Sequence, residues 1–145
     1  MISELKDVNS ISQIVGLLSQ LREREIDIDS VRADVGTIIA SETSTILTAQ
    51  IDDDIVGMAV VNIVIKVGKR EARIDEVVVD ESARGTGMGQ KLMQAAIDWA
   101  WANQCDSIEL TSRASREAAN KLYQKLGFKI RKTNVYQLKR ITGNS

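Results

Sequence analysis

The segment ARGTGMGQK, residues 83–91, places three glycines within five positions, between a predicted strand and a predicted helix. The strand is expected from the β-branched run EVVV, and the helix from the apolar spacing of LMQAAIDWAWAN. Because glycine lowers the stability of a helix start, some other requirement must select it here. A helix N-terminus exposes N–H groups and a positive dipole end, which glycines leave open to a ligand. With Arg84 beside them, the glycines predict a site for a pyrophosphate or a similar anion.

The alternative is structural: Gly85 would be a turn residue, and Gly87 and Gly89 would only let the helix pack close to a strand. Two other phosphate motifs can be tested directly. A dinucleotide fingerprint needs a further glycine where Met88 or Gln90 stands. A P-loop needs Gly-Lys-Ser/Thr, whereas Gly89 is followed by Gln-Lys. Neither motif is present.

The composition excludes several kinds of function. With no histidine and a single cysteine, Cys105, the chain has no His-based triad, His-ligated zinc site or multi-Cys metal site, so we expect no metal. A net charge of −1 and 3% aromatic residues do not suggest a nucleic-acid partner. No apolar run reaches membrane-spanning length, and MISELKDVNS is unlike a signal peptide. We therefore expect a cytoplasmic protein without a membrane partner.

Hydrophobic periodicity predicts an α/β chain that forms one domain over residues 1–145. The expected order is β-α-α-β-β-β-α-β-α-β, beginning with a short strand at ISEL and ending with a strand or bent hairpin at FKIRKTNVYQLK. The helices are expected at residues 9–24, 30–40, 87–104 and 115–126, with Asn9 or Ser10 capping the first and Ser115 the last.

Two motifs carry a family resemblance. They are R-x-x-G-x-G, formed by Arg84, Gly87 and Gly89, and AANKLYQKLGF, residues 118–128. Over roughly residues 45–138, the chain resembles the GCN5-related N-acetyltransferase (GNAT) superfamily. The resemblance implies an α/β GNAT fold: a mixed, mostly antiparallel sheet of six to seven strands, about four flanking helices and a V-shaped splay at the coenzyme site.

The same resemblance implies acetyl-CoA as the acetyl donor and assigns its binding residues. The pantetheine arm would run along the strand at Val77, Val78 and Val79. The pyrophosphate would lie on the turn formed by Arg84, Gly85, Thr86, Gly87, Met88, Gly89 and Gln90.

Tyr123 stands where the family places the tyrosine that protonates the departing thiolate. A phenol with a pKa of about 10 can protonate a thiolate whose pKa is about 8.5. Asn120, one helical turn earlier, would contact the coenzyme, as in glucosamine-phosphate N-acetyltransferases, the members whose motifs are most similar. Many members carry asparagine where this chain has Arg116, which leaves the roles of Arg116 and of nearby Arg113 open.

Glu76 is the leading candidate for the general base. Strand alternation would place Glu76 and Val78 on one face and Val77 and Val79 on the other, and burial would raise the pKa of the carboxyl. Asp75, Glu109 or a water chain are alternatives, and Glu76 as a plain surface carboxylate is another. A covalent intermediate on Cys105 is not favoured, because there is no histidine to activate the thiol.

The function indicated is transfer of an acetyl group from acetyl-CoA to a primary amine of a small molecule, directly within a ternary complex. The alternatives are acetylation of protein N-termini or lysines, or a CoA-binding module without catalysis. The resemblance also implies a homodimer, which the VYQLKR segment could form.

Overall fold

A computed structural model describes residues 1–141 of the chain. Backbone contacts divide the chain into two compact units, Met1–Ser112 and the part that begins at Arg113. The first unit contains, in order, β1 (Ile2–Glu4), α1 (Ile11–Arg22), α2 (Ile28–Ala40), β2 (Ser44–Ile51), β3 (Asp54–Lys66), β4 (Lys69–Val79), the 3₁₀ turn η1 (Glu81–Ala83), α3 (Met88–Ala102) and β5 (Ser107–Leu110). The second unit contains α4 (Glu117–Lys125).

The strands form one sheet in the order β1-β2-β3-β4-β5. The first four strands pair antiparallel, and β5 pairs parallel to β4, so the sheet is mixed as predicted. All four predicted helices are present within a few residues of their expected bounds. Ser10 is the N-cap of α1, one of the two predicted residues, but its side chain makes no capping hydrogen bond. The predicted cap of the last helix is wrong, because Arg116 and not Ser115 precedes α4.

The described residues contain five strands, fewer than the six to seven expected. The difference lies in FKIRKTNVYQLK, where the predicted strand or hairpin is wrong: residues 128–141 have no regular secondary structure. Several large apolar side chains of residues 128–141 are exposed, namely Ile130, Val135, Tyr136, Leu138 and Ile141. Alternating apolar residues suit a strand, but a strand also needs a neighbouring edge for its backbone hydrogen bonds, and the pattern does not supply one.

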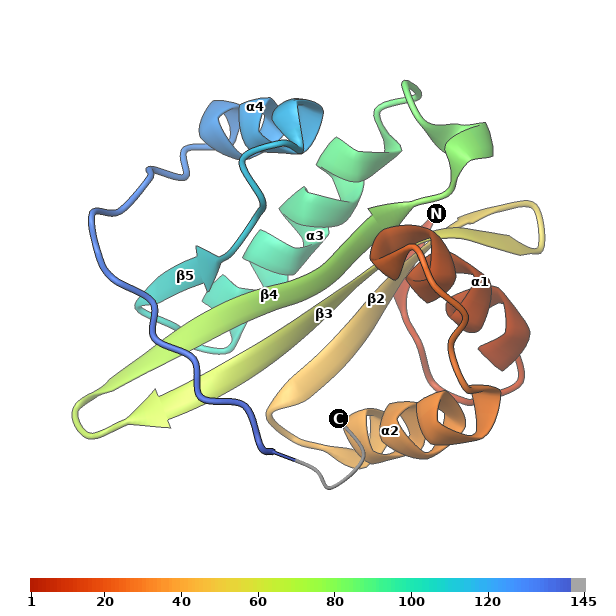
Figure 1. Ribbon diagram of the computed structural model, residues 1–145, viewed down its shortest axis with the longest axis horizontal. Coiled ribbons are helices and arrows are strands. Elements are labelled where there is room, and N and C mark those ends of the chain that lie inside the picture. The colour runs from red at the N-terminus through yellow and green to blue at the C-terminus, as the bar shows by residue number, and fades with distance from the viewer. Residues whose placement is uncertain (142–145) are drawn as a thin grey trace. The chain divides into compact units, whose positions relative to one another are not determined.

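Helices α1 and α2 cover one face of the sheet, and α3 covers the other (Figure 1). On the first face, Ile14 and Val31 belong to one buried cluster with Met58, Val60 and Val78 of the sheet. On the second face, Leu92, Met93 and Ala96 of α3 are fully buried. No helix among residues 1–141 is both long and apolar enough to span a bilayer.

Strand β4 changes character along its length. Its first half, Glu71–Ile74, pairs with β3 on one side and β5 on the other. In its second half, the register with β3 shifts: Asp75 lies opposite Val60 and Val78 opposite Met58, so two residues of β4 face one of β3. Such a β-bulge interrupts the expected alternation of side chains, and it brings Asp75 and Val78 to the same face.

Candidate functional site: a glycine turn at the end of a bulged strand

Gly85 and Gly87 both adopt left-handed backbone conformations, with φ of +79° and +81°. Gly87 is the N-cap of α3, and Gly89 lies in the first turn of this helix. Side chains rarely accept such φ values, so the turn itself requires glycine at these two positions.

Close packing does not explain these glycines. A Cβ atom added to Gly85 or Gly87 would meet no atom within 4 Å. Gly57 in β3 shows the contrast: its Cβ would lie 3.3 Å from the carbonyl oxygen of Val78 and 3.4 Å from the Cβ of Ala49. Gly57 therefore permits close packing, whereas Gly85 and Gly87 border open space that a ligand could enter.

The start of α3 presents backbone donors toward this turn. The N–H of Lys91 bonds to the carbonyl of Gly87 at 3.2 Å, which is the first hydrogen bond of the helix. The N–H groups of Met88 and Gly89 precede that bond and have no acceptor within the helix. Helix α3 is fifteen residues long and has no acidic residue in its first turn, so its N-terminus favours a bound anion.

Asp80 anchors the segment that leads into the turn. Its Oδ2 accepts hydrogen bonds from the backbone N–H of Ser82 at 3.0 Å and from its hydroxyl at 2.5 Å. Its Oδ1 accepts a bond of 2.6 Å from Gln20 of α1, and its own N–H donates to Val56 of β3 at 2.7 Å. Bonds from Ser82 first, and then from Gln20, lower the pKa of Asp80 to about 2.

Arg84 lies between η1 and the glycines. Its Nε donates to the carbonyl of Val79 at 3.1 Å, and its Nη1 is 3.9 Å from the carboxylate of Glu81. The side chain is 55% exposed, so its remaining donors are open to solvent or to a ligand. Thr86, also in the predicted set, donates its hydroxyl to the carbonyl of Ala83 and closes the turn.

Strand β4 leads through η1 to the glycine turn. Since β5 follows β4 only as far as Ile74, the edge of residues 75–79 has no strand beside it on that side within the described chain. The V-shaped splay that the family resemblance implies would lie along this edge. An extended molecule can bind such an edge through backbone hydrogen bonds, as an added strand does.

Glu76 lies at the bulge, with a left-handed φ of +53° that is rare for a residue with a side chain. Its Oε1 is 2.5 Å from Nη2 of Arg22, the last residue of α1. The Glu76 side chain is 27% exposed, so the deep burial expected from the sequence is not observed. Of the alternatives, Asp75 pairs with Nε of Arg73 at 3.3 Å, and Glu109 lies beside Arg73 in the register of β5 with β4.

The second unit holds the other two candidates. Tyr123 is 6% exposed, and its ring meets Phe128 edge to face at 6.2 Å between centroids. Burial raises the pKa of the Tyr123 phenol, while Arg116, which hydrogen-bonds to it, partly opposes the shift. Asn120 donates to the carbonyls of Arg113 at 2.9 Å and of Arg116 at 2.8 Å. Its amide donors therefore hold the start of α4, and its carbonyl oxygen is the atom left for a ligand.

Three residues near the site were not singled out from the sequence. Arg22 and Gln20 lie on a helix whose polar positions resemble an ordinary solvated face, and their contacts join residues 54 and 60 positions apart. The Ser112 hydroxyl, just after β5, is buried without a hydrogen-bond partner among residues 1–141. Cys105 is buried, and burial raises the pKa of its thiol, which makes it a poor nucleophile.

The model of the acetyltransferase (GNAT) family matches residues 15–128. The chain therefore belongs to this family. The α/β GNAT fold predicted from the sequence is confirmed, with five strands in the described sheet.

Several solved structures share this fold. A putative acetyltransferase from Agrobacterium tumefaciens is 21% identical, with a TM-score of 0.84 over 97% of this chain and 99% of that one. A transcriptional regulator from Bacillus halodurans is 28% identical, with a TM-score of 0.83 over 96% and 99%. An aminoglycoside N-acetyltransferase solved with CoA is 20% identical, with a TM-score of 0.83 over 97% and 95%.

A curated relative is the N-acetylaspartate synthetase of Xenopus tropicalis, which is 38% identical over 73 residues. The match covers 48% of this chain and 27% of the synthetase, so this chain spans about a quarter of the length of the synthetase. The particular resemblance to glucosamine-phosphate N-acetyltransferases stays a prediction from the sequence.

Proposed function

We propose that the protein transfers an acetyl group from acetyl-CoA to the primary amine of a small molecule, directly within a ternary complex. The observation that carries the proposal is the pair of left-handed glycines, Gly85 and Gly87, bordering open space at the N-terminus of α3. Backbone N–H groups of this turn would bind the coenzyme pyrophosphate, with Arg84 as an additional cation.

The pantetheine arm would lie along residues 77–79 of β4, where the strand has no neighbour on the β5 side among the described residues. Its amides would pair with the backbone there, because the Val78 side chain is buried in the core and cannot reach the arm. The Ser112 hydroxyl, two residues after the last pairing of β5 with β4, is buried without a partner in the described chain, and a ligand bound along this edge would offer it one.

The reaction forms a C–N bond and breaks a C–S bond. The acceptor ammonium first loses a proton, to Glu76 or through water, and the neutral amine attacks the thioester carbonyl. As the tetrahedral intermediate collapses, the CoA thiolate leaves and takes a proton from Tyr123, while the nitrogen gives up its second proton. In sum, an ammonium and acetyl-CoA yield the amide, CoA and one proton.

A small-molecule acceptor fits the names of two similar proteins, one an aminoglycoside N-acetyltransferase and the other an N-acetylaspartate synthetase. A ribosomal-protein-alanine N-acetyltransferase from Brucella melitensis shares the fold at 19% identity, so a protein N-terminus or lysine is the alternative acceptor. We also propose a cytoplasmic homodimer that pairs through residues 135–140. The exposure of Val135, Tyr136 and Leu138 supports this surface, and light scattering with a Leu138→Asp variant would test it.

The test of the proposed function has two measurements on purified protein. Calorimetry with acetyl-CoA should show saturable binding, and release of the CoA thiol should then depend on an added amine. Binding without transfer to any amine or peptide would indicate a CoA-binding module without catalysis. Absence of binding would refute the proposal altogether.

A further inference from the structure

A polar row crosses the face of the sheet that α1 and α2 cover elsewhere. In register, Asn62 of β3 lies opposite Arg73 of β4, and Arg73 lies beside Glu109 of β5. Paired residues point to the same face, and Val60, two positions from Asn62, belongs to the cluster under α1 and α2. Asp75, opposite Val60, extends the polar row toward the bulge.

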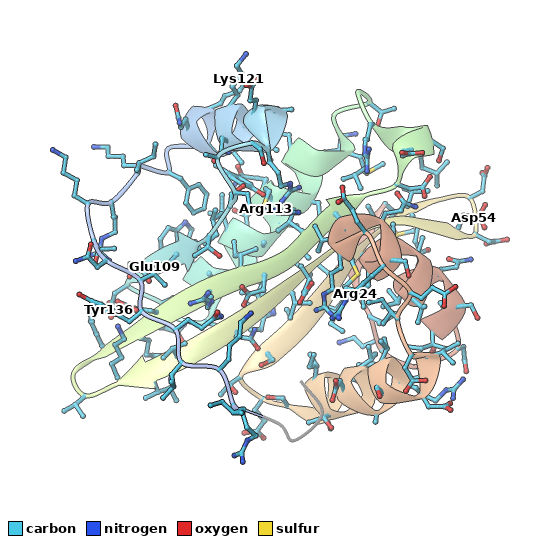
Figure 2. The ribbon with its side chains drawn as sticks, viewed as in Figure 1. Arg24, Asp54, Glu109, Arg113, Lys121 and Tyr136 are labelled. Atoms are coloured by element: carbon cyan, nitrogen blue, oxygen red, sulfur yellow. The ribbon has the colours of Figure 1, made fainter. Side chains whose placement is uncertain are left out.

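The Arg22–Glu76 pair lies at the bulged end of this row. Both side chains are partly open, at 38% and 27% exposure, and a single contact of 2.5 Å joins Nη2 to Oε1. The guanidinium has several further donors and the carboxylate has a second oxygen, and neither forms another ion pair within residues 1–141. Arg24, also exposed, lies just beyond the same end of α1 (Figure 2).

Glu76 has a left-handed backbone inside a strand. Among the described residues other than glycine, Glu23, Asp52 and Gln104 share this conformation, but they lie at a helix end or in turns, where it is common. Within a strand the same conformation is unfavourable, and such strain is often found at functional sites. A partly exposed ion pair contributes little to stability, so the contact with Arg22 does not by itself account for the conformation. The bulge turns Glu76 toward the end of α1.

On these grounds we propose that the acceptor is a small zwitterion with the amine and a carboxylate in the same molecule, as in an α-amino acid. Glu76 receives the ammonium and Arg22 the carboxylate, in the two-point geometry that a guanidinium forms with a planar carboxylate. This inference rests on the proposed acetyl transfer and names its acceptor class. On binding, the ion pair between Arg22 and Glu76 would be replaced by two ion pairs with the acceptor, one at each residue.

Other amines fit the charges less well. A polyamine would offer no anion to Arg22 and would meet the cations Arg24 and Arg73. An aminoalkyl phosphate would carry nearly two negative charges into a site whose three arginines, Arg22, Arg24 and Arg73, are already matched in number by the carboxylates Asp75, Glu76 and Glu109. A carboxylate carries a single charge and suits a site with both signs.

The experiment compares matched acceptors at constant acetyl-CoA: a set of amino acids, their carboxamides, the corresponding amines without a carboxylate, and aminoethyl phosphate. We expect kcat/KM for the best amino acid to exceed that for its carboxamide by about 10- to 100-fold. Arg22→Gln should remove this preference, chiefly through KM, and Arg22→Lys should retain part of it. Arg32→Gln is the matched control, because Arg32 forms an exposed pair with Asp29 at 2.9 Å on α2.

The possible results separate failure of this inference from failure of the proposed function. Equal rates for amino acids and carboxamides, a preference for the phosphate, or a preference that survives in Arg22→Gln would overturn the inference while acetyl transfer itself stands. Acetyl-CoA binding without transfer to any member of the set would also overturn the inference, and it would count against a small-molecule acceptor of any kind. Loss of acetyl-CoA binding in the wild-type protein is a different failure, because it removes the proposed function as well. Calorimetry with acetyl-CoA shows that the Arg22 variants remain folded.

Discussion

Strand β4 follows one glycine turn and leads through η1 to another, and its two halves differ in pairing and in register. The first half comes after Gly68, pairs on both sides, and keeps a regular register. The second half carries the bulge at Glu76, has a strand partner on the β3 side alone within the described chain, and leads into Gly85 and Gly87.

The two turns show that a left-handed glycine does not by itself mark a site. Gly68, with φ of +91°, has the same open surroundings as Gly85 and Gly87. It joins two strands paired at Lys66 and Lys69, so its turn ends in a hairpin whose backbone groups bond to each other. The second turn instead ends at the start of a helix, where backbone donors remain available. Whether a ligand can use such a turn therefore depends on the element into which the glycine leads.

The largest expected effect separates two carboxylates of the same strand. Glu76→Gln should lower kcat by about 10²–10⁴-fold, because it removes a positioned proton acceptor. Glu71→Gln, in the first half, should leave kcat unchanged, since Glu71 pairs with Lys66 and Lys69 at the hairpin. Steady-state measurements of kcat across pH would test both variants. Full activity of Glu76→Gln at every pH would assign the base to Asp75, Glu109 or water.

A second prediction concerns the glycine turns. Gly87→Ala should weaken acetyl-CoA binding by about 10- to 100-fold, because a side chain at this φ displaces the backbone donors from the phosphate. Gly68→Ala introduces the same backbone strain, of about 1–2 kcal/mol, at the other end of β4. The affinity of the Gly68→Ala variant for acetyl-CoA should equal that of the wild type. If calorimetry finds equal losses in the two variants, strain alone explains them and the turn is no coenzyme site.

Arg84→Gln should have a smaller effect. Loss of one exposed cation is expected to weaken acetyl-CoA binding roughly 5-fold at low ionic strength, and the difference from wild type should shrink as salt is added. Titrations at two salt concentrations measure this. Lys69→Gln, which removes a cation at the hairpin end, is the matched control. A difference that stays constant with salt would mean that Arg84 acts through its bond to the carbonyl of Val79 instead.

The smallest effect is on stability in acid. The folded-state pKa of Asp80 lies at about 2, below its ordinary value of 3.8, so its contribution is fully present above pH 3.8 and is lost as the pH falls through 2. Asp80→Asn should therefore flatten the acid limb of a plot of Tm against pH. Hydrogen bonds from Lys66 and Lys69 lower the pKa of Glu71, so Glu71→Gln should flatten the acid limb of this plot as well. Only Asp80→Asn should also weaken acetyl-CoA binding, because Asp80 orders the segment before the turn.

Much of the fold could be predicted, because its signals are local. The apolar spacing of Leu92, Met93 and Ala96 predicted α3, and all three residues are fully buried in its contact with the sheet. The bulge at Glu76 could not be predicted, because EVVV has the pattern of a regular strand and the shift shows only in its pairing with β3. The predicted final strand is wrong for the same reason: residues 128–139 have the composition of a strand, but composition does not supply a partner.

The sequence by itself determined the features on which the proposed coenzyme site rests. Backbone freedom at Gly85 and Gly87, the cation of Arg84 and the absence of histidine are properties of short segments or of composition, so they can be recognised without a structure. Only the tertiary structure decided what surrounds Glu76, because Arg22 lies 54 positions away and reaches it through the packing of α1 on the sheet. Contacts between distant residues depend on how whole elements pack, which no local pattern encodes.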